Sequence, residues 1–288
     1  MKPGPIFIVG SGRSGTSVLT WAIGQHPNVH VVPETYWITA IASHLHGLHK
    51  IGGTTDSAHF SRYNVEFGDF AEGLGYGIDR IARESFRKRF PSALKPKGGM
   101  SYLRSEDEPK QRWVDGTPAN SPYASVIAQI FPEAKFIHLI RHPEDVFRSW
   151  AGLSWRAPEF KKPIALLKHI YHSQRSGYLA EAAFMDRSMR LFYTDMVRQP
   201  ERTMKPVARF IGEDYSPFMA EPLLADKINS SGATKPQVDE ELKSVINSDL
   251  METMRYWYDQ ASDDTWQISE PDDAARALAE YANHKIPL

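Results

Sequence analysis

Residues 5–19 read PIFIVGSGRSGTSVL, an apolar run, a glycine-rich segment and a second apolar run. The run Ile6–Val9 favours a short buried strand that ends at a glycine, and the apolar spacing from Ser17 onward predicts a helix. In a strand–loop–helix unit, the loop N–H groups and the positive end of the helix dipole point at one place. The stretch therefore predicts a phosphate-binding loop at the end of the first strand of an α/β sheet.

The loop differs from that of a nucleotide-hydrolysing P-loop protein, whose pattern is G-x-x-x-x-G-K-[ST]. Gly10 and Gly15 have the right separation, but Thr16 and Ser17 follow directly, so the lysine that would reach the terminal phosphates is absent. The cation of the loop is Arg13, whose planar guanidinium can bind two phosphate oxygens at once. The motif predicts phosphate binding through an arginine in place of a lysine.

Composition is that of an ordinary globular α/β protein. The chain has 288 residues, 41% hydrophobic and 24% charged, and its formal net charge is −1. This charge gives no overall field for nucleic acid or for a membrane surface. No apolar run approaches the roughly 20 residues of a membrane span, and the N-terminal apolar run is too short for a signal peptide. We therefore expect a cytoplasmic protein, and the absence of cysteine excludes disulfides and thiolate metal sites.

Strand and helix patterns alternate along the chain, which predicts a doubly wound parallel sheet. The stretch 44–112 is irregular and the acidic tail 259–280 shows no informative pattern. Further strands are expected at 28–32, 113–114, 134–140 and 189–193. Helices are expected at about 118–131, from 143, at 163–183, at 200–211 and at 237–258.

Ligands of open parallel sheets lie beyond the carboxyl ends of the strands, so residues that follow the strands are candidates for a site. Arg13, Glu34, Arg141 and Tyr193 occupy such positions. Ser149 lies eight residues after Arg141 on the helix that follows, and the pair fits a second phosphate site. The same spacing also fits a surface arginine and a buried serine.

Two of these segments resemble motifs of sulfotransferases that use 3′-phosphoadenosine 5′-phosphosulfate (PAPS). FIVGSGRSGTSVL (residues 7–19) resembles the family's 5′-phosphosulfate loop, and FIHLIRHPEDVFRSW (136–150) resembles its 3′-phosphate motif. HPNVHVVPET (26–35) is similar to tyrosylprotein sulfotransferases and bacterial relatives, and FYTDMVRQPE (192–201) resembles a segment near the cofactor. The resemblance covers about residues 5–40 and 112–212. It implies a P-loop-like three-layer α/β/α fold with a central parallel sheet, as one domain over 1–288.

The resemblance also implies the roles of single residues. Glu34 corresponds to the general base, and Arg13 would stabilise the phosphate oxygen as the sulfur–oxygen bond breaks. Arg141 and Ser149 would bind the 3′-phosphate. Sulfuryl transfer requires no magnesium to neutralise a triphosphate, which accounts for the missing lysine. The remaining residues expected to bind the cofactor are Gly12, Ser14, Gly15, Thr16, Ser17, Tyr193 and Lys235.

Two further positions, Trp150 and Gly116, bear on the cofactor site. Trp150, like Tyr193, is expected either near the adenosine or in the core. Gly116 departs from the family pattern, because several relatives carry a lysine there.

The sequence thus predicts sulfuryl transfer from PAPS to a hydroxyl or amine group, with no metal. The acceptor, a small molecule, a sugar or a peptide, would be recognised by an insertion at 36–112 and by residues 155–162. Two alternatives stay open: a P-loop kinase in which Asp115 binds magnesium, and a nucleotide-binding regulator without catalysis. The spacing of His44, His46 and His49 does not match a helical zinc pair. The sequence does not reveal the oligomeric state.

Overall fold

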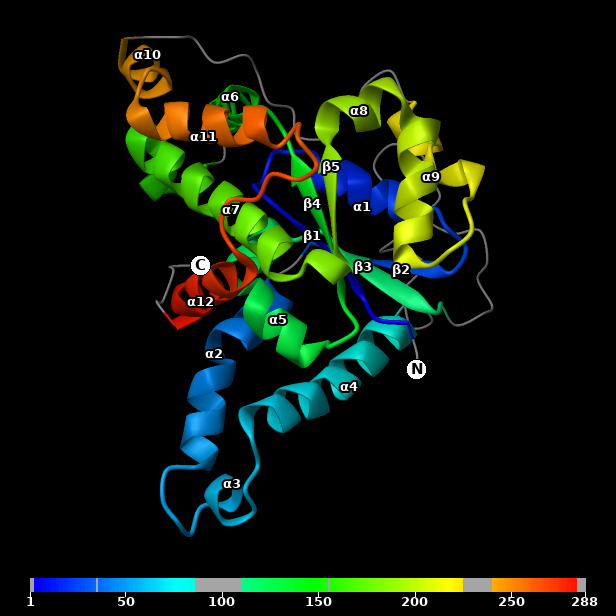
Figure 1. The fold of residues 1–288 in the computed structure, drawn as a ribbon, viewed down its shortest axis with the longest axis vertical. Coiled ribbons are helices and arrows are strands. Elements are labelled where there is room, and N and C mark those ends of the chain that lie inside the picture. The colour runs from blue at the N-terminus through cyan, green and yellow to red at the C-terminus, as the bar shows by residue number, and fades with distance from the viewer. Residues whose placement is uncertain (1–2, 35, 86–109, 155, 225–239, 284–288) are drawn as a thin grey trace.

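The computed structural model describes residues 3–34, 36–85, 110–154, 156–224 and 240–283. At their centre lies a sheet of five parallel strands in the order β2-β3-β1-β4-β5 (Figure 1). This confirms the predicted α/β class with a central parallel sheet. The strands are β1 (Ile6–Val9), β2 (Val29–Val32), β3 (Arg112–Asp115), β4 (Lys135–Ile140) and β5 (Ser188–Phe192).

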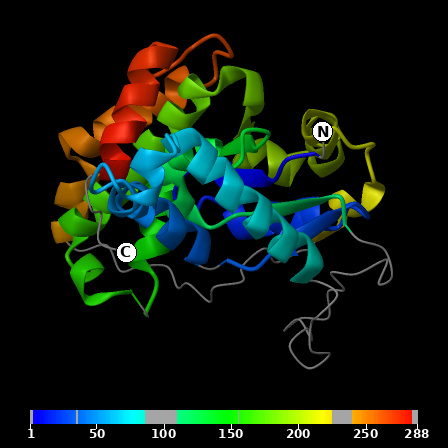
Figure 2. The ribbon, with the colours of Figure 1, turned by 90° about the horizontal axis from the view of Figure 1, so that it is seen from below.

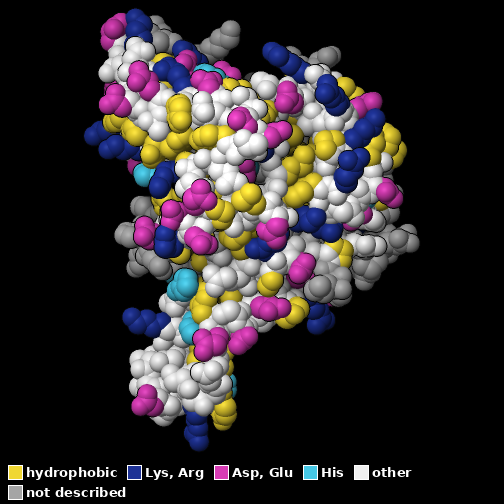
Figure 3. All heavy atoms as spheres, in the orientation of Figure 1, with side chains coloured by type: hydrophobic (Ala, Val, Ile, Leu, Met, Phe, Trp, Pro, Cys, Tyr) yellow, Lys and Arg dark blue, Asp and Glu magenta, His cyan; other side chains and the backbone are white. Residues whose placement is uncertain are grey.

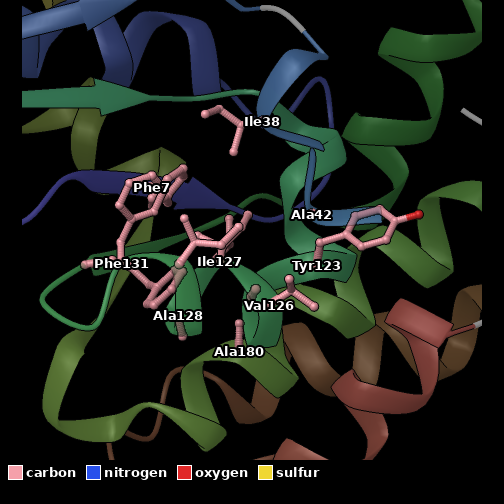
Figure 4. Close-up of a cluster of buried hydrophobic side chains, with 14 of the residues drawn as sticks. Phe7, Ile38, Ala42, Tyr123, Val126, Ile127, Ala128, Phe131 and Ala180 are labelled. Carbon is pink, nitrogen blue, oxygen red and sulfur yellow. The ribbon is translucent and has the colours of Figure 1, made fainter. Parts of the chain in front are cut away.

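Helices cover both faces of this sheet. They include α1 (Thr16–Gly24), α2 (Trp37–Gly52), α4 (Phe67–Ser85), α5 (Ala124–Ile130), α7 (Pro163–Ala183), α9 (Pro200–Ile211) and α12 (Pro271–Asn283). In β1, Phe7 and Val9 belong to an apolar cluster with α2, α4, α5, α7 and α12, part of which Figure 4 shows. Ile6 and Ile8 belong to a second cluster with α1 and α9. The continuous apolar run of β1 is therefore explained by burial on both faces.

A third apolar cluster lies beyond the carboxyl end of β4. It holds α6 (Pro143–Ala151) against α7, together with α10 (Glu240–Ile246) and α11 (Asp249–Gln260). Phe147 of α6 and Met251 of α11 are fully buried in it. Because α6 carries Ser149 on its last turns, this packing fixes the direction from which Ser149 approaches the end of the sheet.

Several predicted elements lie close to their observed bounds, and two predicted helices are interrupted. The strand at 134–140 and the helix at 163–183 correspond to β4 and α7. The helix expected at 118–131 begins as a 3-10 helix, η3 (Pro118–Tyr123), because Pro122 inside it donates no backbone hydrogen bond. The described part of the helix expected at 237–258 is divided into α10 and α11, and Ser248 between them is extended.

Much of the stretch 44–112 that the sequence left irregular is helical. The end of α2, the short α3 (His59–Arg62) and the start of α4 form an arm that extends away from the sheet in Figure 1, and Figure 2 views the molecule from the side of this arm. Four glycines in α4 lower its helix propensity and obscure its pattern. One of them is required by packing, since a Cβ on Gly75 would lie 1.9 Å from the backbone oxygen of Ile130 in α5.

Two of the three histidines considered for a zinc site, His46 and His49, pack against neighbouring residues of the arm. The ring of His46 stacks on Phe67 at 3.9 Å between centroids, and His49 Nε2 lies 2.8 Å from a backbone carbonyl oxygen. Over the described ranges, no three metal-ligating side chains are grouped to hold an ion. His138, in β4, is buried, and its Nδ1 lies 2.7 Å from Glu181 Oε2.

Cationic and anionic side chains are interspersed over the body of the molecule on the face in Figure 3. None of the helices in the described part of the chain is long and apolar enough to cross a membrane. The remaining helix next to the sheet is α8 (Tyr193–Arg198), which begins directly after β5. Its first residue is one of the predicted site residues.

Candidate active site

The glycine-rich loop between β1 and α1 contains several residues with positive φ, a backbone conformation that residues other than glycine rarely adopt. Gly10 and Gly15 have φ values of 127° and 101°, and Arg13 has a φ of 69°, in the left-handed region. A side chain at Gly15 is excluded, because a Cβ there would lie 2.6 Å from Cδ2 of Tyr193. A non-glycine residue at positive φ costs on the order of 1–2 kcal/mol and persists where the surroundings hold it. The loop is therefore held in one strained conformation.

Side chains of other elements form hydrogen bonds with the loop backbone. Trp150 Nε1 of α6 donates to the Gly12 carbonyl at 3.1 Å. Arg141 Nη1, directly after β4, donates to the Arg13 carbonyl at 3.0 Å. At the start of the loop, the Gly10 N–H donates to Ser121 Oγ at 2.9 Å. Trp150 was expected either near the adenosine or in the core. In the structure its ring packs against the third apolar cluster, and its indole N–H also supports the loop backbone.

Arg13 and Arg141 bring two guanidinium groups to the same place. Arg13 Nε donates to Ser149 Oγ at 3.2 Å, so the structure joins the predicted loop arginine to the predicted second phosphate site. The Arg141 guanidinium lies over the Tyr193 ring, 4.4 Å from its centroid. Burial lowers the pKa of Arg13, and the neighbouring charge of Arg141 lowers it further. Two partly buried cations that lie side by side repel each other, and a bound anion would offset this repulsion.

A small pocket of about 60 Å³ opens between these groups and the first turn of α1. The N-cap residue of α1 is Gly15, which has no side chain that could cap the helix, so the first N–H groups of α1 and the helix dipole favour an anion there. The lining residues are Arg13, Gly15, Thr16, Ser17, Val18, Arg141 and Tyr193. All but Val18 were predicted from the sequence to bind the cofactor.

Glu34, two residues after β2, is hydrogen-bonded to Ser17, one of the residues that line this pocket. Ser17 Oγ donates to Glu34 Oε2 at 3.3 Å, which links the carboxylate to the first turn of α1. The Glu34 side chain is exposed, yet desolvation by its surroundings raises its pKa, while the Ser17 hydrogen bond and the charge of Arg13 act in the opposite direction. A carboxylate that is open to solvent and has a raised pKa is suited to accept a proton from an incoming group.

Asp115, at the end of β3, is not among the residues that line the pocket. It is fully buried, and its Oδ1 accepts the Thr117 backbone N–H at 2.7 Å. Burial, with a smaller contribution from the charge of Glu34, raises its pKa to about 6. Next to it, a Cβ on Gly116 would lie 1.9 Å from Thr20 Oγ1, so the contact between β3 and α1 requires a glycine. A lysine at this position would require Thr20 to move.

The structure brings together all the described residues that the sequence analysis assigned to the site. The loop from Gly12 to Ser17, including the buried Ser14, meets Arg141, Ser149 and Tyr193 on one side and Glu34 on the other. Lys235 lies outside the described residues. The hydrogen bonds from η3 to the loop and to α2 were not predicted from the sequence. Pro118, shortly after the end of β3, is the sequence signal for a turn at the carboxyl end of the strands.

The profile of the sulfotransferase family matches residues 5–217. The chain belongs to this family, which confirms the resemblance found in its loop and in its second phosphate motif. It is 22% identical over 285 residues to a protein-tyrosine sulfotransferase of Drosophila melanogaster, a match that covers 96% of this chain and 50% of that protein. It is 27% identical over 152 residues to the nodulation protein NoeE of Sinorhizobium fredii, which covers 53% of this chain and 32% of that protein.

The chain spans about half the length, or less, of these curated relatives. Among solved structures, it is similar to the sulfotransferase domain of a Synechococcus olefin synthase. That match has a TM-score of 0.47 and 20% identity, and it covers 99% of this chain and 97% of the other.

Proposed function

We propose that this chain transfers a sulfuryl group from PAPS to a hydroxyl or amine acceptor, with Glu34 as the general base. The observation that carries the proposal is the convergence of Arg13, Arg141 and Ser149 beside the first turn of α1, with Glu34 hydrogen-bonded to Ser17 at the pocket edge. When bound, PAPS supplies an activated sulfuryl group on a phosphate leaving group. Family membership supports this chemistry over other uses of a phosphate-binding loop.

The residues present fit a ligand with two separate phosphates. Arg141 Nε is buried and has no hydrogen-bond partner among the described residues, so this part of the site has an unused donor. The loop and the hydroxyls of Thr16 and Ser17 would hold the 5′-phosphate, and Arg141 with Ser149 would hold the 3′-phosphate. Arg13 belongs to the loop and donates a hydrogen bond to Ser149, so it contacts both parts of the site and would stabilise negative charge on the leaving oxygen.

Glu34 would remove the proton of the acceptor and release it to solvent. In-line attack requires the acceptor atom within hydrogen-bond reach of the carboxylate. The Ser17 hydroxyl holds one carboxylate oxygen, Oε2, which leaves Oε1 for the acceptor. The resemblance of residues 26–35 to tyrosylprotein sulfotransferases and the exposure of the Glu34 side chain support this role.

The arm formed by the end of α2, by α3 and by the start of α4 is our candidate for acceptor recognition. Helix α2 begins three residues after Glu34, and the arm belongs to the 36–112 stretch, which we propose is a substrate-recognition insertion in a single sulfotransferase domain. The name of the Drosophila relative includes protein tyrosine, and a peptide hydroxyl therefore stands beside small-molecule and sugar hydroxyls as an acceptor class.

The two alternatives receive less support. A kinase would need Asp115 at the phosphate pocket to bind magnesium, but this carboxyl is fully buried and does not line the pocket. A regulator without catalysis would not need a carboxylate at the pocket edge, and it would tolerate loss of Glu34.

A transfer assay with PAPS carrying a radiolabelled sulfuryl group tests the proposal. We expect label to move to at least one member of a panel of phenols, sugars and tyrosine peptides, in the presence of a metal chelator. Transfer of phosphate from ATP with magnesium, and none of sulfate from PAPS, would contradict it.

Arg141→Ala is expected to weaken binding of adenosine 3′,5′-bisphosphate by about 10- to 100-fold, because it removes a charged hydrogen-bond donor from a partly buried site. Calorimetric titration measures the effect. Arg148→Ala is the control, since Arg148 lies on α6 beside the site and pairs with Glu144. Equal affinity in the Arg141 variant and the wild type would contradict the 3′-phosphate assignment.

The pH dependence of kcat/KM is expected to report Glu34. A base must be ionised, so activity falls as pH decreases through its pKa, which desolvation raises above the ordinary glutamate value of about 4.3. Ser17→Ala removes a hydrogen bond that lowers this pKa, and the acid limb should therefore move to higher pH. A profile of both proteins checks this, and an acid limb that moves to lower pH would be inconsistent with the assignment.

A further inference from the structure

One short segment, η3, is hydrogen-bonded to both halves of the candidate active site through two adjacent residues. Ser121 Oγ accepts the Gly10 N–H at 2.9 Å and donates to the Gly10 carbonyl at 3.0 Å. Asn120 Oδ1 accepts the hydroxyl of Thr39 at 2.7 Å. Gly10 begins the loop that carries Arg13, and Thr39 lies in the first turn of α2, just after Glu34.

These contacts are shielded from water. Thr39, Asn120 and Ser121 are each 0% exposed, so a lost hydrogen bond cannot be replaced by bulk solvent. The segment itself is stiff, because Pro118 and Pro122 fix the backbone on both sides of the pair. The Asn120 N–H also donates to the Thr117 carbonyl at 3.0 Å, and the Thr117 N–H is bound by Asp115. The Asn120–Ser121 pair is thereby anchored to the end of β3.

We propose that Asn120 and Ser121 are positioning residues that set the separation between the phosphate loop and the base, Ser121 by holding Gly10 and Asn120 by holding Thr39. This inference rests on the proposed function for its catalytic consequence. Its structural part, that each residue holds a different half of the site, stands without it.

Because Asn120 and Ser121 hold different parts of the site, loss of each contact should affect either the base or the phosphate loop, and not both. If the Asn120–Thr39 bond is lost, the segment before α2 loosens and Glu34 moves relative to the acceptor, whereas the phosphate loop keeps its Ser121 contacts. A misplacement of about 1 Å can lower a rate by about 100-fold without changing the affinity for a ligand bound elsewhere. If the Ser121–Gly10 bonds are lost, the phosphate loop loosens and the affinity for the bisphosphate falls.

The test uses Thr39→Val, which removes the hydroxyl at nearly constant shape, Thr39→Ser, which keeps it, and Ser121→Ala. Hydrogen–deuterium exchange of the full chain is followed at residues 36–40 and at residues 10–17. We expect Thr39→Val to speed exchange at 36–40 alone, Ser121→Ala to speed it at 10–17 alone, and Thr39→Ser to resemble the wild type. In the transfer assay, Thr39→Val should lower kcat by about 10- to 100-fold with the affinity for adenosine 3′,5′-bisphosphate within about twofold.

The inference is overturned if Thr39→Val leaves exchange at 36–40 unchanged, if Thr39→Ser is affected as strongly as Thr39→Val, or if either substitution loosens both segments equally. It is also overturned if Thr39→Val loses bisphosphate affinity in proportion to kcat. A wild-type protein without sulfuryl transfer would contradict the proposed function, and the exchange pattern would still decide the structural division between Asn120 and Ser121.

Discussion

Glu34→Gln is expected to lower kcat by about 100- to 10,000-fold, the range for loss of a general base. The amide keeps the size of the side chain and can still accept the hydrogen bond from Ser17, but it cannot take a proton from the acceptor. Affinity for adenosine 3′,5′-bisphosphate should remain within about twofold, because only the proton acceptor is removed. Steady-state kinetics and calorimetric titration of the same preparation measure both quantities.

Glu133→Gln is the matched control for this substitution. Glu133 is an exposed glutamate just before β4, at the opposite edge of the sheet from the pocket, and we expect its variant to retain the wild-type rate. If Glu34→Gln kept a wild-type kcat, Glu34 would not be the base. If it lost bisphosphate affinity as well, its role would be structural.

Arg13→Ala is expected to lower kcat by about 100- to 1,000-fold, as for loss of a donor that stabilises developing charge. Two physical effects act together. The guanidinium would no longer stabilise the leaving oxygen, and Ser149 would lose the hydrogen bond that Arg13 Nε donates to it. Because Arg13 also lies in the pocket lining, bisphosphate affinity should fall, but by a smaller factor than kcat.

Arg13→Lys distinguishes charge from geometry. A lysine keeps the positive charge but lacks the planar fork that can donate to Ser149 and to a phosphate at the same time. We expect it to recover part of the bisphosphate affinity and little of kcat. Full recovery of kcat by lysine would show that charge alone suffices and would contradict the role assigned to the guanidinium.

The parts of the site that are local in sequence could be predicted from it. The loop from Gly10 to Gly15 stands between a strand and a helix, and Arg141 directly follows β4, so pattern and position were sufficient. Both features depend on residues that are neighbours along the chain. The ends of parallel strands then meet at one edge of the sheet, which brought Arg13, Glu34 and Arg141 together as expected.

The contacts that brace the site could not be predicted in the same way. Ser121 and Gly10 are 111 positions apart, and Asn120 and Thr39 are 81 apart, so no local pattern connects them. The arm was missed for a different reason. The glycines of α4 weaken its helical signal, and at Gly75 the glycine is explained only by contact with α5, which is a tertiary feature.

The measurement that tests the account most directly is thermal unfolding with adenosine 3′,5′-bisphosphate, with ADP, and with ATP plus magnesium, all at the same ligand concentration. A ligand at about 100 times its Kd stabilises the folded state by about 2.7 kcal/mol and raises Tm by several degrees. We predict a rise with the bisphosphate that persists in a metal chelator and is smaller in Arg141→Ala. A rise only with ATP and magnesium would contradict the 3′-phosphate site and favour the kinase alternative.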